Sequence, residues 1–103
     1  MLAHAGVELP MRRIEAFCRK YGIAELSLFG SVLRDDFTPQ SDVDVLIDLE
    51  PDQHMTIEKY LDMCDELSAM LGGRAIDLAQ KRLLKNPYRR HEILKTRQVL
   101  YAA

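Results

Sequence analysis

The 103-residue sequence lacks most features that mark membrane and secreted proteins. No apolar stretch approaches the roughly 20 residues needed to span a bilayer. The first residues, Met1 to Gly6, have neither a charged region nor an apolar core, so we expect no signal peptide. The two cysteines, Cys18 and Cys64, have no paired or metal-ligand spacing, which predicts buried or free thiols in a reducing compartment. These absences predict a small cytoplasmic domain.

Neither the net charge nor the composition is extreme. Fourteen Lys and Arg against sixteen Asp and Glu give a net charge of -2, and 48% of the residues are hydrophobic. These values are ordinary for a globular protein and argue against disordered, collagen-like and coiled-coil classes. They also argue against a protein that coats DNA or RNA. Without a repeat, linker or low-complexity segment, the sequence predicts a single domain over residues 1–103 with one layered core.

The charge is unevenly distributed along the chain. Residues 81–103 carry seven basic side chains and one acid, Glu92, for a net charge of +6, whereas residues 1–80 have a net charge of -8. A segment of this kind is either a solvated helix face with a basic tail or a surface that faces a polyphosphate, a nucleic acid or an acidic partner. Both interpretations stay open at this point.

Hydrophobic periodicity predicts three helices and three strands, with a further strand compatible with the final residues. Helices are expected at 11–21, at 57–71 and from Pro87 onwards. Strands are expected at 26–29, 43–47 and 75–79, and the further one at 99–101. The packed face of the long helix is expected to consist of Ile57, Tyr60, Leu61, Cys64, Leu67, Met70 and Leu71. The order α-β-β-α-β-α predicts an α/β (α+β) fold in which a small mixed β-sheet packs with helices.

Two acids alternate with apolar residues at the start of the second predicted strand. Asp42 and Asp44 point to one face and Val43 and Val45 to the other, because side chains alternate along a strand. The two carboxylates are then about 7 Å apart along the backbone. Charges at this distance repel each other unless they are open to water or hold a cation. An exposed strand start and a metal site are therefore the two interpretations.

Two further features lie on the neighbouring strands. Gly30-Ser31 follows the first strand directly, where it is either a simple turn or a backbone cradle for an anion. Asp77 lies between Ile76 and Leu78, so its carboxylate either faces solvent or meets a positive group. Brought together at one end of a sheet, a phosphate cradle and three carboxylates suit Mg²⁺. Two such ions about 4 Å apart support phosphoryl or nucleotidyl transfer.

These residues match the pattern of a known superfamily. Phe29-Gly30-Ser31, Arg34 and the run from Ser41 to Ile47 resemble the G-S-x10-D-x-D signature of the polymerase-beta-like nucleotidyltransferases. The length, Asn86-Pro87 before a helix, and the final apolar run resemble the minimal nucleotidyltransferases (MNT), the antitoxins of HEPN/MNT toxin–antitoxin pairs. The resemblance extends from about residue 12 to the end and implies the polymerase-beta-like nucleotidyltransferase fold.

The resemblance implies a role for each residue of the two motifs. Gly30 and Ser31 would bind the triphosphate of an incoming nucleotide. Asp42 and Asp44 would bind the metal ions. Asp77 would be the third carboxylate at the metal and would act as a base or polarising group toward the acceptor hydroxyl.

For two residues between the motifs, the resemblance leaves two interpretations open. Arg34 would contact phosphate, or would instead pair with Asp35 or Asp36 at the surface. Ser41 would tie down the loop or help to position a carboxylate at the nucleotide. The family often has a glycine where this chain has Asp35, which leaves the shape of the loop open.

The reaction implied by the resemblance is transfer of AMP from ATP to a hydroxyl of a partner HEPN ribonuclease toxin. It would use Mg²⁺, with a pair of ions expected at the site. The acceptor would be a tyrosine, and the transfer would neutralise the toxin. The chain has no room for a domain that holds an acceptor, so a docking partner is expected to supply it. Two alternatives stay open: an inactive transferase-fold module that blocks the toxin by binding, and a nucleotidyltransferase that acts on RNA or a small molecule.

Overall fold

The computed structural model describes residues 3–4, 7–34, 37–38 and 40–103. The elements in chain order are β1 (Ala3–His4), β2 (Val7–Glu8), α1 (Met11–Tyr21), β3 (Ile23–Phe29), η1 (Gly30–Leu33), β4 (Val43–Leu49), α2 (Ile57–Met70), β5 (Ile76–Gln80), η2 (Lys81–Leu83), α3 (Pro87–Thr96) and β6 (Gln98–Ala102). Every predicted helix and strand is present, including the strand near the end. The ribbon β1–β2 and the 3₁₀ turns η1 and η2 were not predicted, because segments this short carry no periodic signal.

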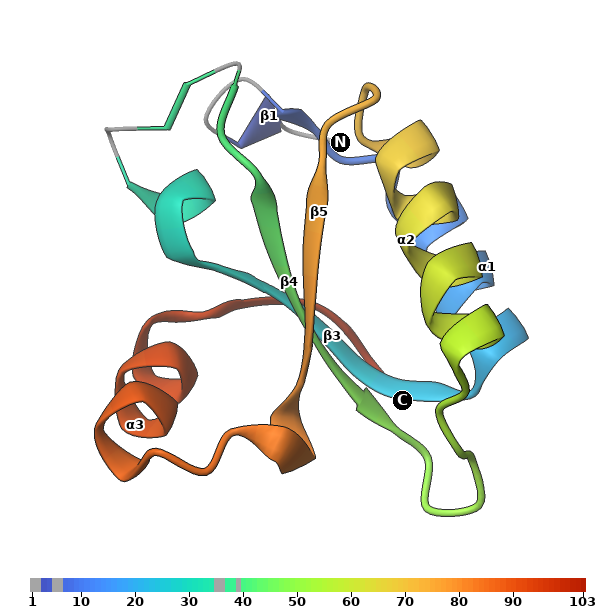
Figure 1. Ribbon diagram of the computed structural model, residues 1–103. Coiled ribbons are helices and arrows are strands. Elements are labelled where there is room, and N and C mark those ends of the chain that lie inside the picture. Colours follow the sequence, from blue (N-terminus) through green and yellow to red (C-terminus); the bar gives the residue numbers. More distant parts are fainter. Residues whose placement is uncertain (1–2, 5–6, 35–36, 39) are drawn as a thin grey trace.

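Four strands form one mixed sheet in the order β5-β4-β3-β6. Strand β3 is antiparallel to β4 and β6, whereas β4 and β5 are parallel. Because β4 and β5 run in the same direction, both strands begin at the same end of the sheet, at the top of Figure 1. The predicted α/β (α+β) class with a small mixed sheet is therefore confirmed.

Local sequence signals set the ends of the helices. Helix α1 ends at Gly22, which adopts the left-handed conformation with φ 66°. Helix α2 follows Thr56, whose hydroxyl accepts a hydrogen bond from the Lys59 amide at 3.1 Å. Helix α3 follows Asn86, which caps two amides, and begins with Pro87 in its first turn. These caps place the loops that lead into the sheet.

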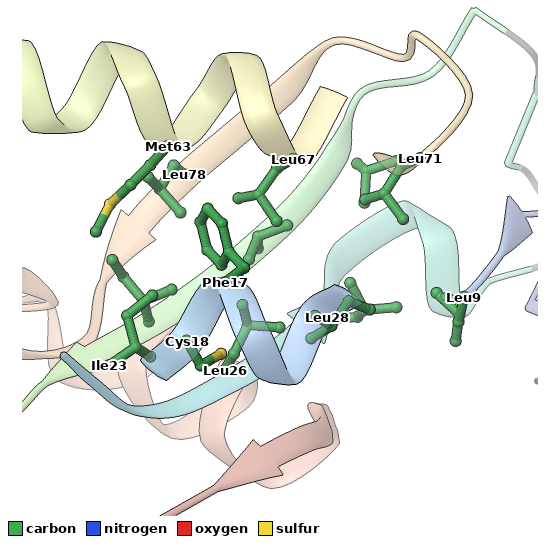
Figure 2. Packing of buried hydrophobic residues seen from close by; sticks show 14 of the residues in the cluster. Leu9, Phe17, Cys18, Ile23, Leu26, Leu28, Met63, Leu67, Leu71 and Leu78 are labelled. Carbon is green, nitrogen blue, oxygen red and sulfur yellow. The ribbon is translucent and has the colours of Figure 1, made fainter. Parts of the chain in front are cut away.

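The main core lies between one face of the sheet and the helices α1 and α2, which run side by side (Figures 1 and 2). Phe17 and Cys18 of α1 and Met63 and Leu67 of α2 are almost fully buried there. Burial of each large apolar side chain stabilises the fold by about 1.5–3 kcal/mol. Both cysteines are free, as predicted, with Cys18 buried and Cys64 half-buried. No helix in the described part of the chain is long and apolar enough to cross a bilayer.

The predicted packed face of α2 is wrong at two positions. Ile57 and Leu61 are 81% and 56% exposed, whereas Met63 is fully buried. Leu61 and Met63 are two residues apart, or about 200° around the helix, so both cannot face the sheet. The helix turns Met63 and Leu67 inward and leaves Ile57 and Leu61 on its outer side.

The other face of the sheet is covered only in part. A small cluster of Phe29, Leu46, Leu84 and Ile93 packs the η2–α3 segment against β3 and β4. In Figure 1, α3 lies far from the edge at which β4 and β5 begin. Near the start of the two strands Asp42 and Asp77 are exposed, and Asp44 is half-buried.

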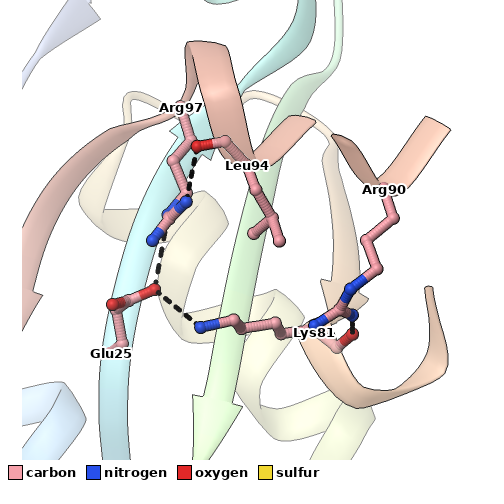
Figure 3. A network of polar contacts seen from close by, with 5 residues as sticks. All are labelled: Glu25, Lys81, Arg90, Leu94 and Arg97. Atoms are coloured by element: carbon pink, nitrogen blue, oxygen red, sulfur yellow. Dashed lines mark hydrogen bonds and ion pairs between the residues drawn. The ribbon is translucent and has the colours of Figure 1, made fainter. Parts of the chain in front are cut away.

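Polar contacts around Glu25 hold α3 and η2 to the sheet (Figure 3). The Glu25 carboxylate lies 3.4 Å from Nε of Arg97 and 3.9 Å from Nζ of Lys81. Arg97 also donates to the carbonyl of Leu94 at 2.6 Å, and Arg90 donates to the carbonyl of Lys81 at 2.8 Å. Three basic residues of the positively charged segment thus have contacts within the fold.

Candidate active site

Asp44 and Asp77 lie opposite each other on the parallel strands β4 and β5. On its other side Asp44 pairs with Phe29 of β3. Because directly paired residues of a sheet project from the same face, Phe29, Asp44 and Asp77 form a row across three strands, which we term the carboxylate row. This row lies on the face that α3 covers only in part, near the start of β4 and β5.

The Asp44 carboxyl group interacts with both Asp77 and the backbone amide of Ser31. Its pKa is raised above the usual range, first by burial, next by the negative charge of Asp77 and by a hydrogen bond that the two carboxyl groups share. A hydrogen bond from the backbone amide of Ser31 acts in the opposite direction and lowers it. The site therefore resists the second negative charge and favours a proton or a cation between Asp44 and Asp77.

Asp42 directly precedes β4 and contributes less to the site than Asp77 does. It is exposed, and its charge is the last and smallest cause that raises the pKa of Asp44. Within the ranges that the structure describes, no three His, Cys, Asp or Glu side chains form a group that could hold a metal ion. The three predicted carboxylates therefore occur as a close pair, Asp44 and Asp77, with Asp42 at its margin.

The Gly-Ser pair forms the start of the 3₁₀ turn η1, directly after β3. Gly30 has φ 73°, in the left-handed region that favours glycine. A Cβ atom at this position would overlap Oδ2 of Asp44. Glycine is therefore required twice, for the turn and for the close approach of the backbone to the carboxylate.

A buried side chain and a backbone hydrogen bond hold the turn η1 in place. Val32 is fully buried, and the amide of Arg34 donates to the carbonyl of Ser31 at 2.9 Å. The Arg34 side chain is exposed. Asp35 and Asp36, its suggested partners, lie outside the described residues.

Ser41 ties the loop that leads into β4. Its hydroxyl accepts a hydrogen bond from the amide of Thr38 at 3.0 Å, and its own amide donates to the Thr38 carbonyl at the same distance. These contacts match the loop-tying alternative predicted for Ser41.

Arg74 is a residue that sequence analysis missed. It precedes β5, yet its guanidinium donates to the carbonyl of Thr38 at 3.1 Å and lies 4.7 Å from the ring centre of Phe37. Arg74 thus links the loop before Asp42 to the strand that carries Asp77. Its only sequence signal is a position after Gly72-Gly73, which indicates a turn and nothing more.

The positively charged segment divides into two groups. Arg82 donates to the carbonyl of Leu49 at 3.1 Å, so it contacts the fold as Lys81, Arg90 and Arg97 do. Lys85, Arg89 and Lys95 are exposed, and Tyr88 beside them is 86% exposed.

Residues 11–100 match the protein family described as "Nucleotidyltransferase domain". The chain belongs to this family. Protein adenylyltransferase MntA of Thermococcus cleftensis is 36% identical to this nucleotidyltransferase domain over 67 residues, which are 65% of each chain.

Solved structures show the same fold. A structure described as a toxin–antitoxin with AMP-PNP superposes with a TM-score of 0.71 at 15% identity, covering 92% of this chain and 75% of the other. A structure assigned as a minimal nucleotidyltransferase has a TM-score of 0.69 at 26% identity, covering 85% of this chain and 86% of the other. The predicted nucleotidyltransferase fold and the resemblance to the minimal nucleotidyltransferases are therefore confirmed.

The chemistry of the carboxylate row fits Mg²⁺. This ion is usually held by one or two carboxylates together with substrate phosphates and water, and Asp44 and Asp77 form such a pair. Burial and the charge of Asp77 raise the pKa of Asp44, and a cation between the two carboxylates would oppose both effects. The Ser31 amide donates to the Asp44 carboxylate and the Gly30 backbone lies against it, so the turn η1 and the carboxylate pair form one site.

Proposed function

We propose that this chain is an antitoxin that transfers AMP from ATP to a hydroxyl group of a partner toxin, and that it uses Mg²⁺. The related MntA is a protein adenylyltransferase by name, and one structural relative was solved as a toxin–antitoxin with AMP-PNP. The observation that carries the proposal is the pairing of Asp44 with Asp77. The Asp44 carboxylate also lies so close to the backbone at Gly30 that only glycine fits there.

Each residue of the site has a proposed role. The backbone at Gly30 and Ser31 binds the triphosphate of ATP, with Arg34 at its rim. Asp44 and Asp77, with Asp42 at the margin of the pair, would hold Mg²⁺, most simply two ions, and the metal would supply positive charge to the phosphates and the leaving pyrophosphate. Ser41 keeps the loop before Asp42 in place through Thr38.

The proposed reaction forms one bond and breaks one. The acceptor oxygen attacks the α-phosphorus of ATP, the bond from this phosphorus to the bridging oxygen breaks, and pyrophosphate leaves with the bond electrons. Asp77 takes the proton from the acceptor hydroxyl. Its exposed position on the edge strand β5 suits this role, because an acceptor has to approach from outside.

The proposed partner is a HEPN-type ribonuclease, and the proposed acceptor is one of its tyrosines. We also infer that residues 1–103 are one nucleotidyltransferase domain, since both hydrophobic clusters pack on the same four-stranded sheet. The exposed Asp77, on a face of the sheet that α3 covers only in part, leaves space for the acceptor of a partner. A cytoplasmic location, where ATP and a ribonuclease meet, stays a prediction.

The test is a transfer assay with purified partner toxin, Mg²⁺ and ATP labelled at the α-phosphate. Label is expected on the toxin with the native chain, and the variant with Asp42→Asn and Asp44→Asn is expected to transfer at least a hundredfold less while still binding the toxin. Full neutralisation of the toxin by this variant would instead support the inactive binding module. Label on RNA would support the nucleic-acid alternative, for which Tyr88 and its basic neighbours are the exposed surface.

A further inference from the structure

A pocket of about 310 Å³ lies between the turn η1 and helix α3. Phe29, Gly30, Leu33 and Arg34 line it from one side, and Glu92, Ile93 and Thr96 line it from α3. Pockets of this order of size, apolar inside with a few polar groups, are typical of small-molecule sites.

The pocket is continuous with the candidate active site. Its lining residue Phe29 pairs directly with Asp44, so the two lie about 4.8 Å apart, the distance between neighbouring strands. Gly30 lines the pocket and also approaches the Asp44 carboxylate. A nucleotide with its phosphates at Gly30 and Ser31 therefore has this pocket within reach of its sugar and base.

The two charged residues of the lining lie at opposite ends of the pocket. Arg34 lies at the end formed by the Gly-Ser turn, and Glu92 lies at the end formed by α3. A triphosphate is repelled by the Glu92 carboxylate, so its phosphates belong at the opposite end of the pocket, beside Gly30. A base is uncharged, stacks on apolar groups such as Ile93, and offers an exocyclic amine that a carboxylate accepts.

We propose that this pocket binds the base of the donor nucleotide, and that Glu92 selects adenine by accepting a hydrogen bond from its exocyclic amine. The proposal rests on the proposed function for the identity of the ligand, a nucleoside triphosphate. It adds the place of the base and a residue that distinguishes adenine from a purine with a carbonyl at the same position. Such a carbonyl faces the Glu92 carboxylate without a proton between them, which costs binding energy.

The first experiment fills the pocket from α3. Thr96→Trp places a large ring in the lining, while Lys95→Trp places the same ring one residue earlier, where it borders a different hollow with Pro87 and His91. Binding of ATP and of inorganic tripolyphosphate is measured with Mg²⁺ and without any acceptor. We expect Thr96→Trp to weaken ATP binding about tenfold, or about 1.4 kcal/mol, and to leave tripolyphosphate binding unchanged. Lys95→Trp is expected to change neither.

The second experiment tests the selection of the base with a conservative change. The native chain is expected to bind ATP about tenfold more tightly than inosine triphosphate, which has a carbonyl in place of the amine. Glu92→Gln is expected to remove this preference, because an amide both donates and accepts. Glu92 is exposed, so this variant also covers the case in which Thr96→Trp does not fold.

The outcomes separate this proposal from the proposed function. Unchanged ATP binding in Thr96→Trp, equal loss of ATP and tripolyphosphate binding, or an unchanged preference in Glu92→Gln each overturns the base pocket. Transfer of AMP to the toxin by the native chain would stand in all three cases. Conversely, a base-dependent loss of binding in a chain that labels no acceptor supports the pocket and contradicts the transfer.

Discussion

Asp44 and Asp77 face each other across two parallel strands, and the charge of Asp77 is one of the causes that raise the pKa of Asp44. The fold therefore keeps two acids together at a cost in free energy. Polar and charged groups that destabilise a fold are common at functional sites, where a ligand compensates them.

The first prediction concerns the stability of the Asp44→Asn variant. A raised pKa means that Asp44 favours folding when protonated, and that this contribution is lost as the pH rises through its folded-state pKa. At pH 7 and without Mg²⁺, Asp44→Asn should therefore melt a few degrees higher than the native chain. The difference should shrink in acid. Asp52→Asn, at an exposed turn, is the control and should show no such pattern.

The second prediction compares two glycines with similar backbones. Gly30→Ala and Gly72→Ala both place a Cβ atom at positive φ, which costs about 1–2 kcal/mol. Only at Gly30 does this atom also collide with Asp44, since at Gly72 no atom lies within 4 Å. Gly30→Ala should lose nucleotide transfer at least tenfold more than Gly72→Ala. Equal activities of the two variants would show that the close approach at Gly30 has no role.

The third prediction concerns Arg74 as a positioning residue. Arg74→Ala removes both the hydrogen bond to Thr38 and the contact with Phe37, so the loop before Asp42 loses its link to β5. The variant should need several times more Mg²⁺ for half-maximal transfer, with little change in melting temperature. Arg74→Lys, which retains the charge without the planar group, should restore part of the Mg²⁺ response. An Mg²⁺ response identical to the native one in Arg74→Ala would argue against this link.

The fourth prediction has the opposite pH dependence to the first. Glu66 of α2 accepts hydrogen bonds from Lys20 and Tyr21 of α1, and these bonds lower its pKa. Its contribution to stability is therefore present above its unfolded-state pKa and lost as the pH falls through the folded value. Glu66→Gln should melt a few degrees lower than the native chain at pH 7 and at nearly the same temperature in acid. Asp65→Asn, exposed in the middle of the same helix, should have little effect at either pH.

The short-range part of this fold could be predicted from the sequence. The alternation correctly assigned Val43 and Val45 to the core and Asp44 to the other face, and Asp42 is exposed. The predicted end of the first helix at residue 21 and start of the second at residue 57 are also confirmed, with Gly22 and Thr56 as the caps. Each of these features depends on neighbouring residues alone.

The remaining features depend on residues distant in the chain. The pairing of Asp44 with Asp77 requires the register of two strands, which no local pattern contains. Strand β4 and helix α2 separate Thr38 from Arg74 in the chain, and the exposure of Ile57 depends on the rotation of α2 against the sheet. Tertiary packing decides these features, so the structure was needed to find them.

The most direct test of nucleotidyl transfer follows the α-phosphate and the γ-phosphate of ATP separately. The native chain, Mg²⁺ and the partner toxin are incubated in parallel with ATP labelled at the α-phosphate and with ATP labelled at the γ-phosphate. Nucleotidyl transfer through the Asp44–Asp77 site predicts α-label on the toxin, γ-label in free pyrophosphate, and neither product with Asp44→Asn. Label from the γ-phosphate on the toxin, or α-label transferred equally well by Asp44→Asn, would contradict the account.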